Sequence, residues 1–418
     1  MSDFFDITDG LIKIGQAITK QGGILSCSNT NPSLDELRAG VLSITKLPAI
    51  TSGQATIVVA ELPNTTIKVF TQSGTLVSSK TTNSTTGGTL TFSVTAGNNY
   101  VVSAYNSSGT ELWTRTMGVV NAGSNLCKPN KLLEDYTWAE INTAAKNGYA
   151  DFMFHIWDSK KLATFMGSTT DTYRKAYIIG FNHDLKVSGG TAGITFMLER
   201  TSSSYKHWNT SATNDNGISW VGSLIRANCL KSGDVRYVFD KSVTSTTEGT
   251  FYAFDSETGN FVQKTLPADF EEGVKYYTAE TLTADGAFIA GLPTEMLNYI
   301  VQVKKKTWGG YGGTVLNSTN ANEDNVIIET KDWMFIPSDC EVFGNKNRYT
   351  KYSKFAEEGE TYEAFKEYNE NHFWCSSNRW LRSPYLSSSN YFCCWSGSGC
   401  VTYTSASTTC CCPLCFCL

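Results

Sequence analysis

Two kinds of hydrophobic periodicity divide the first third of the chain. The first is a short heptad pattern, which predicts an amphipathic helix; its a and d positions are Phe4, Ile7, Leu11, Ile14 and Ile18. A second helix is expected from Ser33, because Glu36 three residues later completes a capping box. Residues 1–45 are therefore predicted to be a helical segment, either a short oligomerisation or attachment helix or an amphipathic helix that belongs to a domain.

The second periodicity is an alternation of apolar and polar residues, which begins near Gln54 and ends near Val120. It gives six short β-rich runs that glycine-containing turns separate: ATIVVAEL, TTIKVFT, TLVSSK, TLTFSVT, YVVSAYN and ELWTRTMGV. Short strands at such regular spacing are typical of a small β-sandwich of immunoglobulin-like type. We therefore expect such a sandwich over residues 46–122, without the Cys…Trp…Cys spacing of antibody domains.

The remainder of the chain has a mixed pattern. Residues 121–129 (NAGSNLCKP) have the composition of a linker. Helices are expected over 137–147, 217–229 and 293–305, the last with Pro293 in its first turn. A Thr-, Gly- and aromatic-rich stretch at about 233–290 is interpreted as an inserted β-hairpin unit. The fold class predicted for the whole chain is therefore α+β and multidomain, with residues 130–418 forming the C-terminal domain.

The distribution of charged residues is most unusual at the C-terminus. The 418 residues carry 34 basic and 39 acidic side chains, a net charge of −5, which argues against a nucleic-acid-binding protein. After Arg382 no Asp, Glu, Lys or Arg occurs. Eight of the 13 cysteines lie in this uncharged tail: Cys393, Cys394, Cys400, Cys410, Cys411, Cys412, Cys415 and Cys417.

The compartment is constrained by two patterns that the sequence does not contain. The residues MSDFFDITDGLIKIG have neither the basic nor the apolar region of a secretory signal, and no apolar run is long enough to span a membrane. We expect a protein that is made in the bacterial cytoplasm with reduced thiols and has no membrane partner. A virion component released by lysis fits this expectation.

Known catalytic and metal-binding patterns are absent from the sequence. No His-Glu-x-x-His motif occurs, and the glycines of residues 307–314 (TWGGYGGT) lack the Lys-Ser/Thr of a phosphate loop. His183, next to Asp184, is expected to be a hydrogen-bonded structural residue. No catalytic residue, metal ligand or cofactor is therefore assigned.

The tail cysteines leave several interpretations open. Adjacent cysteines such as Cys393-Cys394 lack the spacing of zinc sites, although Cys412, Cys415 and Cys417 could be ligands together with His372 and Cys375. Disulfides would require oxidising surroundings. A catalytic thiol would need a neighbouring base or cation, which the tail does not supply.

A binding surface explains the composition of this tail better than cysteine chemistry does. Tyr, Ser, Gly and Asn are typical of binding loops, and the tail is polar without charge. Apart from Trp395, every residue from 385 to 418 can be encoded by a codon that ends in a pyrimidine. We interpret the cysteines as members of this codon set that occupy exposed positions.

The end of the chain also resembles a known family. The sequence WLRSP (380–384), a Ser/Asn/Tyr-rich stretch, the turn Gly399-Cys400-Val401 and the terminal PLCFCL (413–418) are similar to the diversified C-terminus of the variable proteins of diversity-generating retroelements. Upstream segments that carry the resemblance include YTWAEI (136–141), IIGFNHD (178–184), SWVGSLIR (219–226), FIPS (335–338) and EGETY (358–362). The resemblance implies a C-type-lectin-like domain of the formylglycine-generating-enzyme type that displays a diversified tail at about 385–412.

In phages such proteins are receptor-binding proteins of the tail. The resemblance therefore implies a virion protein that binds a host bacterial surface receptor, a protein or a glycan, and that contacts phage tail proteins; a homotrimer or another homo-oligomer would fit the heptads. The residues expected to be displayed for ligand binding are Tyr385, Ser387, Ser389, Asn390, Tyr391, Cys394, Ser396, Ser398, Cys400, Thr402, Tyr403, Thr404, Ser405, Ser407, Thr408 and Cys410. The expected scaffold residues are Trp380, Arg382, Pro384, Gly399, Ala406 and Pro413. The alternative is a formylglycine-generating-type thiol oxidase that uses Cys415 or Cys417.

Overall fold

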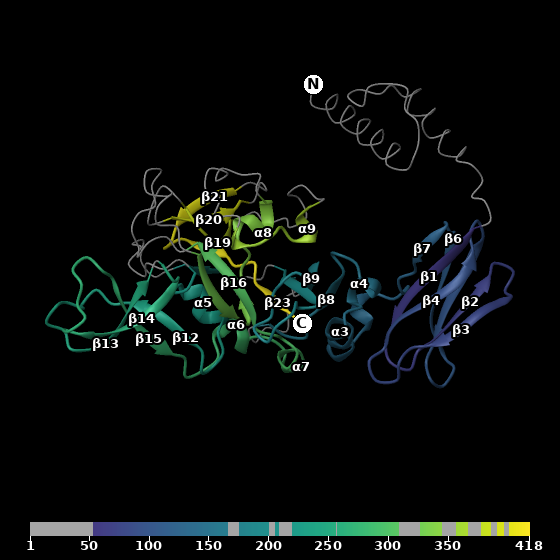
Figure 1. The fold of residues 1–418 in the computed structure, drawn as a ribbon, viewed down its shortest axis with the longest axis horizontal. Coiled ribbons are helices and arrows are strands. Elements are labelled where there is room, and N and C mark those ends of the chain that lie inside the picture. The colour runs from purple at the N-terminus through teal and green to yellow at the C-terminus, as the bar shows by residue number, and fades with distance from the viewer. Residues whose placement is uncertain are drawn as a thin grey trace, which may run out of the picture. The chain divides into compact units, whose positions relative to one another are not determined.

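The computed structural model shows a mostly β protein that divides into two compact units (Figure 1). The first unit comprises residues up to 60, 64–84 and 89–130, and the second comprises 61–63, 85–88 and 131–418. The residues that the structure describes are 53–165, 175–199, 205–208, 220–255, 257–308, 327–344, 357–366, 378–385, 391–396 and 401–418. The helices expected within residues 1–45 lie outside these ranges. Among the described residues, no helix has the length and apolar character to cross a membrane.

The first unit consists of two β-sheets that share one hydrophobic core. One sheet has the strand order β4-β1-β7 and the other β3-β2-β5-β6. Their bounds are β1 Gln54–Glu61, β2 Thr66–Thr71, β3 Leu76–Thr81, β4 Gly88–Thr95, β5 Asn99–Tyr105, β6 Glu111–Val119 and β7 Gly123–Leu126. The first six strands confirm the six runs predicted from the alternation. Side chains such as Ile57, Phe92 and Val102 fill the core, because they occupy the apolar positions of that alternation.

One sequence-based boundary in this unit was wrong. Residues 121–129 were expected to be a linker, but β7 pairs in parallel with β1, and Cys127 is buried in the core. Asn125 explains why a polar segment can form this edge strand. Its side-chain amide donates to the carbonyls of Asn121 and Thr56, so its polarity serves the strand's own hydrogen bonding. The sandwich therefore extends beyond residue 122.

The second unit contains two five-stranded sheets and two smaller ones. The strand orders are β18-β23-β10-β9-β8, β11-β22-β19-β20-β21, β12-β15-β13-β14 and β16-β17. The strands of the first are β8 Ser159–Lys161, β9 Lys175–Phe181, β10 Ile194–Leu198, β18 Met334–Phe335 and β23 Cys415–Cys417. Those of the second are β11 Tyr205–His207, β19 Arg379–Pro384, β20 Tyr391–Trp395, β21 Val401–Ser405 and β22 Thr409–Cys411.

Two smaller sheets complete the second unit. The four-stranded sheet falls within the expected insertion, forms one end of the second unit in Figure 1, and consists of β12 Val235–Phe239, β13 Gly249–Asp255, β14 Asn260–Leu266 and β15 Tyr276–Thr281. The two-stranded sheet consists of β16 Val303–Trp308 and β17 Ile327–Asp332.

The helices of the second unit are short. They are η1 Leu133–Asp135, α3 Trp138–Lys146, α4 Ala150–Met153, α5 Leu224–Cys229, α6 Ala287–Ala290, α7 Thr294–Leu297, α8 Asp339–Phe343 and α9 Glu363–Lys366. The predicted helix at 137–147 is confirmed, with Thr137 and Glu140 forming a capping box at its start. The helix predicted over 293–305 was wrong: it is the single turn α7, after which β16 begins.

Candidate ligand-binding face

The sheet β11-β22-β19-β20-β21 brings together residues of the uncharged tail that are distant in sequence. In the hairpin of β20 and β21, Tyr391 pairs with Ser405 and Cys393 pairs with Tyr403. Side chains of paired antiparallel residues lie on the same face of a sheet, so Tyr391 and Tyr403 are diagonal neighbours. Tyr385 follows β19 and donates its backbone N–H to the Tyr391 carbonyl at 3.1 Å.

These three tyrosines form a compact aromatic cluster. The rings of Tyr385 and Tyr403 stack with centroids 4.0 Å apart, and the Tyr391 ring stands edge-on to Tyr403 at 5.5 Å. Tyr391 and Tyr403 remain 37% and 42% exposed, whereas Tyr385 is half-buried. Large rings that pack on one another yet stay accessible offer a rigid apolar contact area with phenol groups at its rim.

Hydroxyl groups line β21 and the turn that follows it; Ser405 shares the face of Tyr403, whereas Thr402 and Thr404 lie on the opposite face of the strand. Thr404 donates to Thr408 at 3.2 Å, and the Ser405 and Ser407 hydroxyls lie 3.1 Å apart. Thr408 is exposed, and the half-buried members of this group are Ser396, Thr402, Thr404, Ser405 and Ser407. The structure therefore leaves nine of the predicted display positions at least partly accessible, and all nine are uncharged.

Two predicted display positions are corrected by the structure. Cys394 is 0% exposed and Cys410 is 3% exposed, so neither is displayed. Cys394 pairs with Trp380, whose ring lies 5.7 Å from the Trp208 ring in the core. The alternation of the strand therefore turns Cys394 inward. The other predicted positions, Ser387, Ser389, Asn390, Ser398 and Cys400, lie outside the described residues.

The interpretation of the tail cysteines as exposed residues is also wrong for those that the structure describes. Cys393, Cys394, Cys410, Cys411, Cys412, Cys415 and Cys417 are all buried. Burial raises the pKa of the Cys415 and Cys417 thiols well above the usual value, because a thiolate would lose its hydration there. These cysteines act as small apolar core residues.

The expected scaffold residues lie under this face. Trp380 and Ala406 are fully buried, Pro384 and Pro413 are buried as well, and Gly399 lies outside the described residues. The Trp208 ring stacks on Phe392 of β20 at 4.1 Å, which ties the hairpin to the core. Arg382, also fully buried, belongs to a network of buried charges.

That network joins four charged side chains from separate elements, and Lys305 on β16 is at its centre. Lys305 Nζ donates to Asp184 Oδ1 at 2.6 Å, to Glu341 Oε1 at 2.5 Å and to the Tyr362 hydroxyl at 3.1 Å. All four of these residues are buried. Because an unpaired buried charge is costly, the carboxylates hold the lysine in one position.

Arg382 connects the network to the sheet that carries the tyrosine cluster, because it lies on β19. Its Nη1 donates to Glu341 Oε2 at 3.1 Å and to the Ile336 carbonyl at 2.6 Å. Its Nε donates to Thr307 Oγ1 at 2.8 Å. Two cations therefore balance two carboxylates, and their hydrogen bonds fix β19 against β16 and α8.

The pKa values of these groups shift in the directions that stabilise charge. Burial opposes ionisation of Asp184, but the neighbouring charge of Lys305 outweighs it and lowers the pKa. Burial likewise opposes ionisation of Glu341, and Arg382 and Lys305 together lower its pKa. The pKa of Lys305 is raised, since the attraction of Asp184 and Glu341 exceeds the effect of burial.

A second buried ion pair lies deeper under the sheet. Asp332 accepts from Arg226 Nε at 2.8 Å and from the Trp220 indole at 2.9 Å. The Trp220 ring is 6.1 Å from the Trp208 ring, which itself stacks on β20. The pair therefore supports the aromatic core beneath the hairpin.

Lys305 was not predicted as a buried residue, because it falls at the end of the helix expected over 293–305. Val303, Lys305 and Thr307 are buried in the strand, while Lys304 and Lys306 lie on its more exposed side. The alternation of residues in this strand was a signal that could have indicated a buried face. A run of three lysines does not indicate burial, because lysine is rarely buried. The expectation for His183 is confirmed: its Nε2 lies 2.9 Å from the Glu360 carbonyl, and its ring lies 4.0 Å from that of Tyr362.

The chain is a mostly β protein in which a two-sheet unit precedes a larger unit that carries an exposed cluster of tyrosines. Residues 192–418, more than half of the chain, match the model of a protein family described as Domain of unknown function (DUF6273). The chain belongs to this family. A search of curated proteins finds no match to the sequence.

Proposed function

We propose that this chain is a hypervariable ligand-binding protein, a receptor-binding protein of a phage or prophage tail. The observation that carries the proposal is the cluster of Tyr385, Tyr391 and Tyr403, which comes from the uncharged tail and lies beside accessible hydroxyls. Tyrosine provides a large contact area at a low cost in conformational entropy, and small hydroxyl residues adapt their hydrogen bonds. Such a face suits a host surface receptor, whether protein or glycan.

The accessible tyrosines are separate from the buried residues that hold the sheet in place, and this separation supports diversification of the accessible positions. The buried network of Lys305, Asp184, Glu341 and Arg382 fixes β19 without using any tyrosine of the cluster. Substitutions at the accessible positions would therefore change binding while leaving the buried ion pairs intact. A retroelement that rewrites adenines in this part of the gene would exploit that separation.

The finer fold assignments belong to the same proposal. In it, the two-sheet unit is an immunoglobulin-like spacer, and residues 130–418 form a C-type-lectin-like domain. The first 45 residues attach the protein to other tail proteins or assemble it as a homotrimer or another homo-oligomer, which would multiply a weak single-site affinity. The protein is made in the bacterial cytoplasm, is carried in the virion, and binds through side-chain contacts without a cofactor.

The competing thiol-oxidase function receives less support from the described residues. Its candidate nucleophiles Cys415 and Cys417 are fully buried, and their raised pKa disfavours the thiolate that such chemistry requires. The Cys417 thiol also lies 3.5 Å from the Asp184 carboxylate, which disfavours a second negative charge. A non-enzymatic binding role is therefore the better proposal.

Binding to whole bacterial cells tests the proposed function. Fluorescently labelled full-length protein is titrated onto a panel of strains related to the host, and the doubly substituted Tyr391→Ala, Tyr403→Ala protein is compared with Tyr299→Ala. Tyr299 is a half-buried tyrosine after α7 and serves as the matched control. We expect strain-selective binding that weakens at least about tenfold in the double variant and is unchanged in the control. Equal binding by all three proteins, or binding to no strain, would refute the proposal.

A further inference from the structure

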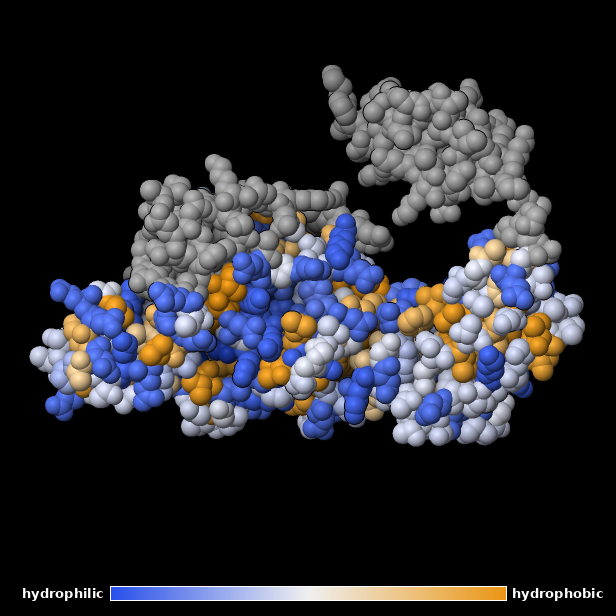
Figure 2. Space-filling view, viewed as in Figure 1, coloured by the Kyte–Doolittle hydropathy of each residue, from blue (hydrophilic) through white to orange (hydrophobic). Residues whose placement is uncertain are grey.

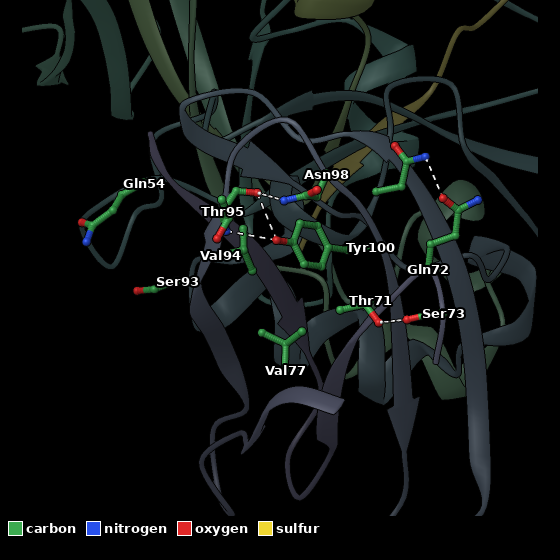
Figure 3. Close-up of a pocket in the computed structure, with 11 residues that line it drawn as sticks. Gln54, Thr71, Gln72, Ser73, Val77, Ser93, Val94, Thr95, Asn98 and Tyr100 are labelled. Atoms are coloured by element: carbon green, nitrogen blue, oxygen red, sulfur yellow. Dashed lines mark hydrogen bonds between the residues drawn. The ribbon is translucent and has the colours of Figure 1, made fainter. Parts of the chain in front are cut away.

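The first unit contains a cleft of about 750 Å³ that is separate from the tyrosine face. It lies where an edge strand of each sheet comes close to the other, since β4 is at the edge of one sheet and β3 at the edge of the other. Figure 3 shows Gln54 and Ser93 on one side of the cleft and Thr71 and Ser73 on the other. The volume lies within the usual range for small-molecule sites, and the cleft is open to solvent.

The lining of the cleft is uncharged. None of its 11 residues is Asp, Glu, Lys, Arg or His, and eight of them carry an amide or a hydroxyl on an aliphatic side chain. Each of these groups can both donate and accept hydrogen bonds. The surface of the first unit that is visible in Figure 2 is mostly pale, the colour of residues with weak hydropathy.

Hydrogen bonds within the wall hold these groups in place before any ligand arrives. The Tyr100 hydroxyl bonds both the backbone N–H and the carbonyl of Thr95, each at 3.0 Å (Figure 3). The Asn99 amide donates to Gln72 Oε1 at 3.1 Å, which leaves the Gln72 amide nitrogen without an acceptor among the described residues. A pre-positioned donor of this kind lowers the entropic cost of binding.

One exposed apolar side chain accompanies the polar groups, because Val77 of β3 lines the cleft and is 40% exposed. A saccharide has both properties that this lining matches, because its hydroxyls donate and accept while its C–H faces are apolar. An ionic ligand would gain no countercharge from this lining.

We infer that this cleft binds a neutral saccharide. This inference does not depend on the proposed function of the C-terminal face, because the two surfaces belong to different units and share no residue. The saccharide would engage Gln72, Asn98 and the hydroxyls of Thr71 and Ser73, with one C–H face on Val77.

Titration of the full chain with defined trisaccharides tests the inference. The neutral probes are N,N′,N″-triacetylchitotriose, cellotriose and maltotriose, and the charged probes are deacetylated chitotriose and trigalacturonate. Binding of each probe is measured by saturation-transfer NMR at probe concentrations up to about 10 mM. We expect at least one neutral probe to bind and both charged probes to bind at least about tenfold more weakly.

Substitutions locate the binding and keep the test decisive. Val77→Asp places a charge in the cleft and Gln72→Ala removes the pre-positioned amide; both are expected to weaken binding at least about tenfold. Leu112→Asp introduces the same charge at an exposed aliphatic residue on the other edge strand of the same sheet, and binding should be unchanged. Val77→Asp and Leu112→Asp should melt at similar temperatures, which separates binding from folding.

Three outcomes would overturn the inference. They are the absence of binding by every neutral probe, tighter binding of a charged probe, and equal weakening by Leu112→Asp and Val77→Asp. The Tyr391→Ala, Tyr403→Ala protein should bind the saccharide normally, so failure of this inference is distinguishable from failure of the proposed function.

Discussion

Replacement of Lys305 by methionine should be the most damaging conservative change in the second unit. The Lys305 ammonium group is 2.6 Å from Asp184 and 2.5 Å from Glu341, and it lies 4.2 Å from the centroid of the Phe335 ring. Methionine fills a similar volume but leaves the buried Asp184 carboxylate without its cation. Removal of one partner from a buried ion pair costs about 3–5 kcal/mol. For a unit of this size the melting temperature should fall by about 6–15 °C.

Lys304→Met is the matched control, because it removes the adjacent lysine from the same strand. Its ion pair with Glu329 is 3.4 Å long, and both side chains are more than one-third exposed. A pair of this kind contributes about 0–1 kcal/mol, so the control should melt close to the wild-type temperature. Differential scanning calorimetry and urea unfolding of the full chain measure both variants. Similar melting temperatures for Lys305→Met and Lys304→Met would refute the network described above.

The pH dependence of the free energy of unfolding provides a second readout of the same residues. Asp184 and Glu341 have lowered pKa values in the folded chain, so their stabilisation is present above the unfolded pKa of about 4 and is lost as the pH falls below it. Lys305 has a raised pKa, so its stabilisation is present below about pH 10.4 and is lost at higher pH. In Lys305→Met the defect should shrink at acid pH, because protonation of Asp184 removes the uncompensated charge. A defect that is constant from pH 7 to about pH 3 would contradict this reasoning.

Three further predictions concern the packing of the second unit. Arg382→Lys should lower the free energy of unfolding by about 2–4 kcal/mol, because an ammonium cannot reproduce the separate Nε and Nη1 bonds to Thr307 and Ile336. The control Arg236→Lys, at the surface, should lower it by less than about 1 kcal/mol. Equal losses in urea unfolding would contradict the assigned role of Arg382. Gly193→Ala should lower the free energy of unfolding by about 1–3 kcal/mol, since a Cβ there would lie 2.3 Å from the Ala145 carbonyl oxygen. Gly118→Ala is the control, because a Cβ there would have no atom within 4 Å. An unchanged unfolding midpoint for Gly193→Ala would refute the close approach. In a chain with serine at 27, 375 and 400, the remaining ten cysteines should react with Ellman's reagent only after unfolding, and a fast reaction of the native chain would contradict their burial.

The first unit was largely predictable, because its stability follows a local pattern. Most strands from β1 to β6 have apolar residues at alternate positions, and glycine turns such as Gly74 mark several of their ends. The strand β7 was not predictable, since its polar residues pair with β1, which is distant in sequence. In this register Gly123 pairs with Ala55, 68 positions earlier. Composition alone therefore interpreted it as a linker.

The tyrosine face was predictable in composition, but the orientation of its side chains was not. The tail's lack of charge and its tyrosines indicated a surface, and Tyr391 and Tyr403 are exposed. Which residues turn inward depends on the register of β19 with β20, in which Trp380 pairs with Cys394. That register is set by tertiary contacts, so the burial of Cys394 and Cys410 could not be predicted from spacing.

Buried charges were the least predictable feature. Lys305 is surrounded by partners from positions 184, 341 and 362, and only the folded chain brings them together. In a sequence, a lysine between two other lysines indicates an exposed position.

Sequencing of this gene and its copies in sibling genomes tests most directly whether the C-terminal face is a diversified binding surface. We predict that substitutions concentrate at accessible tail positions such as Tyr385, Tyr391 and Tyr403, at adenines of a neighbouring template copy. The codons of Trp380 and Arg382 should be unchanged. Substitutions scattered evenly along the gene, with no template copy, would contradict the proposal.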